Sequence, residues 1–298
     1  VFFMLENYVH TDLALELKEE IPKEQGMQGV QVETLEDKEY GITKTHIRVL
    51  DERGEKLLGK QIGNYITLES DQLCAEDENI HQPFVEALHE TLAELLAGIR
   101  KILVIGLGNR NITPDALGPG VVDHLFITRH LLREGYLTSS MEISALCPGV
   151  MAQTGIETSA IIQSLCREIN PEAVVCIDAL AARDAKRLNT TIQICDTGIT
   201  PGAGVGNRRL SLNQKTLGVP VIAVGVPTVI SMPAILEHAL EGMCDAMSDK
   251  EREHIDRELI RYMQKPDVAG MFVTPKNIDE IITRVSYTIS EAINRFLT

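Results

Sequence analysis

Two kinds of hydrophobic spacing follow one another along this chain, and they predict different elements. Between residues 29 and 69 the apolar residues form short β-prone runs, which predict a small antiparallel sheet with residues 51–54 as a turn between two strands. Over residues 81–99 the apolar spacing becomes three and four, which predicts an amphipathic helix that ends near Gly98. The apolar positions of this helix are Phe84, Leu88, Leu92, Leu95 and Leu96.

After residue 100, runs that are apolar on both faces alternate with amphipathic stretches. Such runs are typical of buried parallel strands, and they cover residues 101–105 and 173–177. Residues 190–194 and 219–226 also predict strands, with a short strand at 272–273. The amphipathic stretches predict helices over residues 121–132, 154–170, 233–247, 249–264 and 277–297. Strands that alternate with helices predict an α/β fold: a doubly wound, mostly parallel sheet with helices on both faces, plus a small N-terminal antiparallel β appendage.

The ends of these elements carry local signals. Thr154 and Glu157 have capping-box spacing, which predicts that the helix over residues 154–170 begins there. Residues 1–27 are charged and have no clear apolar period, so they predict a mobile N-terminal segment. We therefore expect an N-terminal tail at 1–27 and a single α/β domain over 28–298, which includes the small β subdomain at about 28–70.

Charge and composition exclude several classes of protein. The chain has 298 residues, of which 44% are apolar and 24% charged, as in soluble globular proteins. Its 28 Lys and Arg against 43 Asp and Glu give a formal net charge of −15, which disfavours direct binding of nucleic acid. No apolar run reaches the roughly 20 residues that span a bilayer, and the N-terminus lacks a signal-peptide pattern. We expect a cytoplasmic protein that does not bind membranes.

Three common kinds of catalytic or metal site have no motif here. The six cysteines include no CxxC pair, which argues against a zinc site, and Cys166, Cys176 and Cys195 lie in apolar segments typical of reduced core residues. The sequence has no HExxH motif of the zincins and no GxSxG nucleophile elbow of the α/β hydrolases. We expect no metal and no cofactor.

Two aspartates stand where an α/β sheet places its functional groups. In such sheets ligands bind beyond the carboxyl ends of the strands, near the point where the strand order reverses. Asp115 lies in the loop after the strand predicted at 101–105, and Asp178 follows the strand predicted at 173–177. If these strands are neighbours, both carboxylates face one crevice.

A close pair of carboxylates supports hydrolysis. Two such groups cannot both ionise easily, so one keeps its proton while the other acts as a base. The base activates a water and the acid polarises a carbonyl, as in aspartic proteases. Each residue also has a structural interpretation: Asp115 as a residue at a helix start and Asp178 as a polar cap on a strand end.

Two glycine-rich loops flank these aspartates. Gly106, Gly108 and Asn109 form a GxGN loop that lacks the third glycine of a dinucleotide fingerprint, so we expect close backbone approach there. The second loop, GITPGAGVG at 198–206, is either a loop that contacts the substrate or a long surface turn. Its candidate site residues are Gly202, Gly204 and Gly206.

Six longer segments together resemble one protein family. They read VIGLGNRNITPDALGP (104–119), CPGVMAQTGIETS (147–159), IDALAAR (177–183), TGITPGAGVGN (197–207), GVPVIAVGVPT (218–228) and FVTPK (272–276). They are similar to the germination protease family of spore-forming bacteria, and the likeness runs from about residue 11 to beyond residue 276. The segment at 230–270 is shorter than expected for that family.

The resemblance implies a function and a set of site residues. It implies an endopeptidase of the spore core, made as a zymogen and assembled as a homotetramer, whose substrates are small acid-soluble spore proteins. The family's two essential carboxylates fall on Asp115 and Asp178. The N-terminal stretch is similar to the family's processing site, which places a self-cleavage between Asp12 and Leu13.

Two other functions remain open on the sequence. The GxGN loop with its two aspartates is also similar to the hydrogenase maturation endopeptidases, which recognise nickel with the help of a His. The corresponding stretch here, residues 212–215, has no His. A non-catalytic α/β module that binds a small ligand, with both aspartates structural, is the third interpretation.

Overall fold

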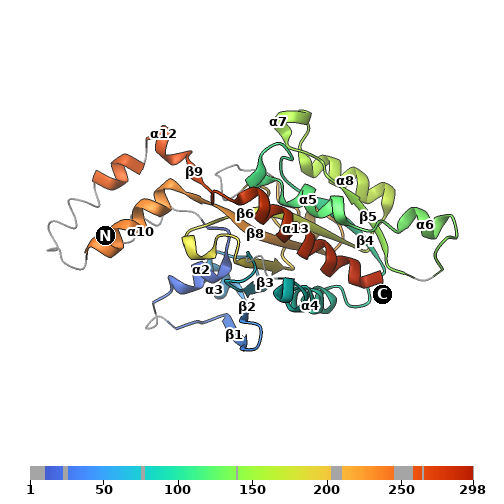
Figure 1. Ribbon diagram of the computed structural model, residues 1–298, viewed down its shortest axis with the longest axis horizontal. Helices are drawn as coiled ribbons and strands as arrows, with labels where there is room; N and C mark the ends of the chain where they lie inside the picture. The colour runs from blue at the N-terminus through green and yellow to red at the C-terminus, as the bar shows by residue number, and fades with distance from the viewer. Residues whose placement is uncertain are drawn as a thin grey trace.

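One mixed sheet organises the molecule. The computed structural model describes residues 11–22, 26–74, 78–138, 140–202, 210–244, 258–263 and 265–297. Its nine-stranded sheet has the order β1-β2-β3-β7-β8-β6-β4-β5, and β9 pairs with β8 (Figure 1). The strands are β1 (Val30–Asp37), β2 (Ile42–Val49), β3 (Gly63–Glu69), β4 (Lys101–Gly106), β5 (Glu142–Leu146), β6 (Ala173–Ala182), β7 (Thr191–Cys195), β8 (Val221–Ser231) and β9 (Phe272–Val273).

Parallel strands form the centre of this sheet. The neighbouring pairs β5–β4, β4–β6 and β6–β8 are parallel, which confirms the predicted parallel core. The strands β1, β2 and β3 pair antiparallel, as expected for the N-terminal region. They do not stand apart, however, because β3 pairs with β7 and so joins them to the central sheet.

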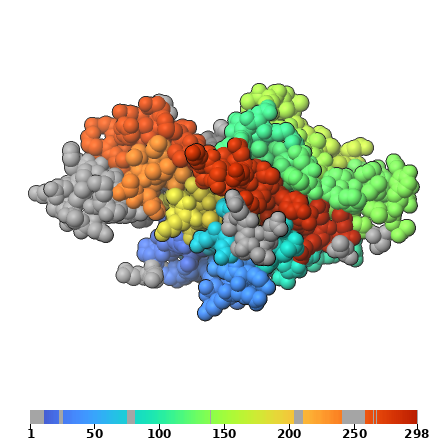
Figure 2. Space-filling model, in the orientation of Figure 1, coloured from blue at the N-terminus to red at the C-terminus, as the bar shows by residue number. Residues whose placement is uncertain are grey.

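Helices cover both faces of the sheet. The longer ones are α4 (Glu78–Leu95), α5 (Leu117–His124), α8 (Thr158–Ile169), α10 (Met232–Cys244) and α13 (Ile278–Asn294). The shorter ones are α2 (Ala14–Glu19), α3 (Glu52–Leu58), α6 (Arg129–Arg133), α7 (Met151–Thr154), α9 (Gln214–Leu217) and α12 (Pro266–Ala269), with 3₁₀ turns η2 (Thr113–Asp115), η3 (Ala185–Arg187) and η5 (Arg295–Leu297). In Figure 2, α13 (red) lies across one face between the residues of α5 and those of α4.

Alternate residues of the central strands enter different cores. On β4, Ile102 and Val104 pack with α4, α5 and α13, whereas Leu103 and Ile105 pack with α8 and α9. All four side chains are fully buried, and burying each stabilises the fold by about 1.5–3 kcal/mol. The strand is apolar on both faces because both faces are covered, which is why a run with no alternation predicted it correctly.

The strand order reverses beside β4. The chain passes from β4 to β5 on one side and returns through α8 to β6 on the other side. The gap between the carboxyl ends of β4 and β6 is therefore the topological switch point, where α/β folds bind ligands.

Three local predictions were wrong at element ends. The helix predicted over 121–132 is broken, because Leu125 is extended (φ −74°, ψ 139°) between α5 and α6. The capping box at Thr154 does not form: α7 ends there, Gly155 turns left-handed at φ 68°, and α8 begins only at Thr158. The turn predicted at 51–54 is instead the start of α3, capped by the Asp51 side chain on the N–H groups of Arg53 and Gly54.

Other predictions concern the cysteines and the helices near the C-terminus. Cys166, Cys176 and Cys195 are buried and free, as predicted. Of the helix predicted over 249–264, residues 258–263 are helical and 249–257 lie outside the described residues. Within the described part of the chain, no helix is long and apolar enough to cross a membrane.

Candidate active site

Asp115 is held at the end of β4 by the loop that the strand enters. The 3₁₀ turn η2 ends at Asp115, and the Asn109 N–H donates to both its carbonyl (3.0 Å) and its Oδ2 (2.8 Å). Gly108 makes this approach possible, since its φ is +109° and a Cβ there would lie 2.0 Å from the Asp115 carbonyl oxygen. The GxGN loop thus fixes the orientation of the Asp115 carboxylate.

Asp178 lies on the neighbouring strand. Sequence spacing placed it just after a strand, but β6 continues to Ala182, so Asp178 lies inside the strand opposite Gly225 of β8. Its side chain is 6% exposed, and its Oδ1 accepts from the Ala179 N–H at 3.0 Å. The position is set by the sheet: Ile177, the residue before it, pairs with Gly106 at the end of β4.

The two aspartates line one cavity at the switch point. The cavity has a volume of about 460 Å³. Thr228 holds its wall by donating to the Pro114 carbonyl at 2.7 Å, and Thr274 donates to the Thr228 carbonyl at 2.9 Å. Besides Asp115 and Asp178, the cavity is lined by Asp12, Ile112, Pro114, Ala179, Leu180, Ala181, Ile199, Thr200, Gly202, Thr228, Val229, Phe272 and Thr274.

Asp12 reaches this cavity because the N-terminal segment docks on β6. The Asp12 N–H donates to the Ala181 carbonyl at 3.1 Å, and the Ala181 N–H donates to Asp12 Oδ2 at 2.9 Å. Leu13 is fully buried and packs against Leu180 and Ala182. Residues 11–22 are therefore packed on the sheet, in contrast to the mobile segment predicted for the N-terminus.

Buried charge anchors the same segment. Glu16, 4% exposed, accepts the backbone N–H groups of Arg183 and Asp184, both at 2.9 Å. Arg187 pairs with Glu16 (3.7 Å) and with Glu19 (2.8 Å). Charge-assisted hydrogen bonds of this kind are the stronger ones, so they fix where the chain enters the cavity.

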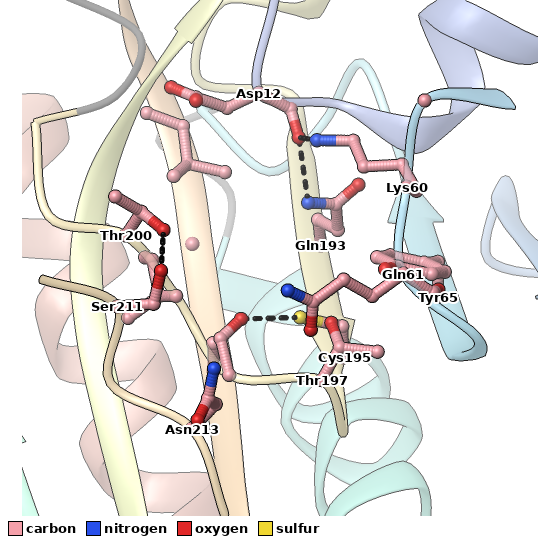
Figure 3. Close-up of a pocket in the computed structure, with 16 residues that line it drawn as sticks. Asp12, Lys60, Gln61, Tyr65, Gln193, Cys195, Thr197, Thr200, Ser211 and Asn213 are labelled. Atoms are coloured by element: carbon pink, nitrogen blue, oxygen red, sulfur yellow. Dashed lines mark hydrogen bonds between the residues drawn. The ribbon is translucent and has the colours of Figure 1, made fainter. Parts of the chain in front are cut away.

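A second cavity adjoins the first at Asp12. It has a volume of about 190 Å³ and is lined by Lys60, Tyr65, Gln193 and Cys195, among others (Figure 3). Burial lowers the pKa of the Lys60 ammonium, and the charge of Asp12 opposes that shift. Burial also raises the pKa of Tyr65 and of the Cys195 thiol, so both stay protonated at neutral pH.

The chain matches one family model over most of its length. The model described as "Peptidase_A25: Germination protease" matches residues 9–254. The chain belongs to the germination protease family. It is therefore an endopeptidase, and the family's name associates it with germination.

Curated relatives from several genera support the membership. Germination proteases of Caldanaerobacter subterraneus and Clostridium tetani are 43% and 42% identical, each over 96% of this chain and 93% and 94% of their own length. The Bacillus velezensis germination protease is 36% identical over 97% of this chain and 93% of its own. Among solved structures, a NiFe hydrogenase maturation protease from Thermococcus kodakarensis covers 70% of this chain and 98% of its own, with 18% identity and a TM-score of 0.37, a likeness too weak to support an argument.

The other candidate glycines of the two loops differ in what the structure shows of them. Gly106 lies where β4 meets α5, and a Cβ there would be 2.4 Å from the Gly118 carbonyl oxygen. Gly202 lines the cavity of the two aspartates, whereas Gly204 and Gly206 lie outside the described residues. The role of Gly202, Gly204 and Gly206 as a loop of the site stays a prediction.

Sequence reasoning missed the residues that receive the N-terminal segment. Lys60 and Gln193 belong to no motif, and Arg187 lies beyond the IDALAAR segment. The acidic residues Glu16 and Glu19 pair with Arg187, which lies about 170 residues further along the chain. A linear sequence pattern does not reveal that pairing. Among the described residues, no three His, Cys, Asp or Glu side chains are grouped to hold a metal ion.

Proposed function

We propose that this germination protease initiates the degradation of small acid-soluble spore proteins in the spore core, with Asp115 and Asp178 as its catalytic pair. We also propose that it is a self-processed zymogen cut between Asp12 and Leu13, and that it works as a homotetramer. One observation supports the catalytic part above all: Asp12, Asp115 and Asp178 line the same cavity.

The chemistry follows from two carboxyl groups that share a site. Like charges close together favour a state with one shared proton, so one group is an acid and the other a base at the same pH. The base takes a proton from water, and the water oxygen adds to the peptide carbonyl carbon. The carbon–nitrogen bond then breaks, and the leaving nitrogen takes up a proton from the acid.

Single amide substitutions test the pair. We expect Asp115→Asn and Asp178→Asn each to lower cleavage of a small acid-soluble spore protein at least about 100-fold, because each removes a proton-transfer group. Asp279→Asn is the matched control, since Asp279 is exposed on α13. Thermal unfolding checks that the variants fold. Activity retained by either Asp115→Asn or Asp178→Asn would remove the two-carboxylate mechanism.

Self-processing has a direct readout. Intact-mass spectrometry of the freshly made chain should show conversion to a product whose N-terminus is Leu13, and Asp178→Asn should stay unconverted. A non-catalytic binding module would not trim itself. A chelator separates the metal-dependent alternative, because a two-carboxylate mechanism keeps its rate when divalent cations are removed.

The assembly and the substrate are tested separately. Light scattering should give about four times the 32.9 kDa of one chain. Digestion of a small acid-soluble spore protein, compared with an unrelated unfolded protein of similar length, should show limited cleavage of the first and little of the second. Equal, unselective digestion of both would refute the assigned substrate class.

A further inference from the structure

The peptide unit between Asp12 and Leu13 is held at both of its polar atoms. Its carbonyl oxygen, on Asp12, accepts from Lys60 Nζ at 2.9 Å and from Gln193 Nε2 at 3.1 Å. Its N–H, on Leu13, donates to Thr11 Oγ1 at 3.0 Å. Figure 3 shows the two donors converging on the Asp12 carbonyl, while the Asp12 carboxylate points away from them.

The two donors come from different parts of the fold. Lys60 follows α3, and Gln193 lies on β7, where its Oε1 also accepts the Ala14 N–H at 2.7 Å. Gln193 is 7% exposed, so its amide is fixed by the sheet and by this second bond. A pair of donors held rigidly on one carbonyl oxygen, one of them an ammonium, is the arrangement that stabilises an oxyanion in acyl transfer.

We propose that Lys60 and Gln193 form the oxyanion hole for self-cleavage at Asp12–Leu13, an inference that rests on the proposed cut at this bond. When water adds to the Asp12 carbonyl carbon, its π electrons move to the carbonyl oxygen, which becomes an oxyanion. Lys60 Nζ and Gln193 Nε2 donate to that oxyanion. The base of the Asp115/Asp178 pair takes the proton of that water. When the carbon–nitrogen bond breaks, the oxyanion reforms a carbonyl, and the acid of the pair gives its proton to the Leu13 nitrogen, which leaves as an amine.

The position of Asp12 between two cavities fits the separate roles of the two carboxylates and the two donors. Asp12 lines the cavity of Asp115 and Asp178, and it also lines the cavity of Lys60 and Gln193. Asp12 thus borders both the cavity of the carboxylates and the cavity of the two donors. Lys60 is partly shielded from solvent, and the lower local dielectric makes its hydrogen bond to the Asp12 carbonyl stronger than it would be in water.

Removal of the Lys60 donor is the decisive perturbation. Lys60→Met keeps an unbranched side chain only one atom shorter and removes its N–H groups, so we expect the first-order rate of cleavage to fall about 100- to 1000-fold. Lys56→Met, on the exposed face of α3, is the matched control. Gln193→Glu retains an acceptor for the Ala14 N–H but loses the donor, and it should slow cleavage by a similar factor.

A second measurement separates transition-state stabilisation from simple docking. In an Asp178→Asn background the bond stays intact, and hydrogen exchange over residues 11–19 reports how firmly the segment is bound. We expect Lys60→Met to change that exchange less than about threefold while it slows cleavage about 100-fold or more, since only the transition state carries the full oxyanion charge.

The outcomes distinguish this inference from the proposed function. Cleavage is followed by intact-mass spectrometry at timed intervals after cell-free synthesis. If the wild-type chain cuts at Leu13, Asp178→Asn does not, and Lys60→Met cuts at the wild-type rate, the oxyanion hole is refuted while the proposed function stands. A loss of cleavage no greater than the loss of docking also refutes it. If the wild-type chain does not produce an N-terminus at Leu13, the proposed processing site fails and this inference fails with it.

Discussion

Glu16 offers a quantitative test of how the N-terminal segment is held. Its carboxylate is buried and accepts the backbone N–H groups of Arg183 and Asp184, both at 2.9 Å. The substitution Glu16→Ala leaves these two donors without a partner inside the docked structure. Each unsatisfied buried group costs about 1–3 kcal/mol, and the ion pair with Arg187 is lost as well.

The expected loss is limited by local undocking. When the segment leaves the sheet, water satisfies both N–H groups, so the penalty appears as weaker docking and leaves global stability largely unchanged. The two groups together cost about 2–6 kcal/mol, and we take about 3 kcal/mol from the lower half of that range, which corresponds to a fall of roughly 100-fold in the hydrogen-exchange protection of α2.

Hydrogen exchange with mass spectrometry measures this effect. We use an Asp178→Asn background, because the proposed self-cleavage would otherwise release residues before Leu13 during the experiment. Peptides from residues 11–19 should lose protection in Glu16→Ala, whereas peptides from β4 should not change. Glu33→Ala, which removes an exposed partner of Arg48, is the control. Unchanged protection over residues 11–19 would show that Glu16 does not anchor the segment, and the energetic reasoning would be wrong.

Three further predictions concern the cavity and the thiols. Gly108→Ala should lower peptidase activity at least about 100-fold, because its Cβ would displace the Asp115 backbone, and wild-type activity would contradict this. Thr228→Val removes the donor to the Pro114 carbonyl and should lower the free energy of unfolding by about 1–2 kcal/mol in denaturant titration; a change below 0.3 kcal/mol would argue against that bond. Burial raises the pKa of Cys74 from 9.0 to about 11, so its alkylation should accelerate mainly between pH 9 and 11, as followed by peptide mass spectrometry. Because the thiol of the unfolded chain ionises at lower pH, Cys74 should also lower the free energy of unfolding as pH rises through that window. An alkylation rate with its pH midpoint near 9 would refute the shift.

The fold was predictable where the sequence pattern has a single physical cause. Buried parallel strands such as β4 are apolar on both faces, and the predicted run at 101–105 differs from the observed strand by one residue. The location of Asp115 and Asp178 followed from the switch-point rule, which depends on the order of strands and helices. Their common cavity is a consequence of β4 and β6 being neighbours.

Predictions that depend on competition between local bonds were less successful. Thr154 has the sequence spacing of a capping residue, yet its Oγ1 bonds back to the Val150 carbonyl and helps to close α7. Gly155 then takes the left-handed conformation that ends a helix. The same few residues can thus start one helix or end another, and packing of the following segment decides between them.

The docking of the N-terminal segment could not be predicted from its own residues. Leu13, Ala14 and Leu15 form an apolar run that is too short to show a period, although all three are buried. Their partners lie far along the chain: Ala14 contacts Gln193, and Glu16 contacts the loop after β6. Only tertiary structure brings these charges together.

The contacts around Asp12–Leu13 also suit the charges that hydrolysis creates. Cutting a neutral amide yields a carboxylate on Asp12 and an amine on Leu13 that is protonated at neutral pH. The new carboxylate would face Lys60, which already donates to that oxygen. The new ammonium would form beside Thr11 Oγ1, which is itself hydrogen-bonded to the Glu16 carboxylate. Each product charge would thus meet a group of complementary character in contacts that are already formed. The electrostatics that position the intact bond would also stabilise its cleaved state.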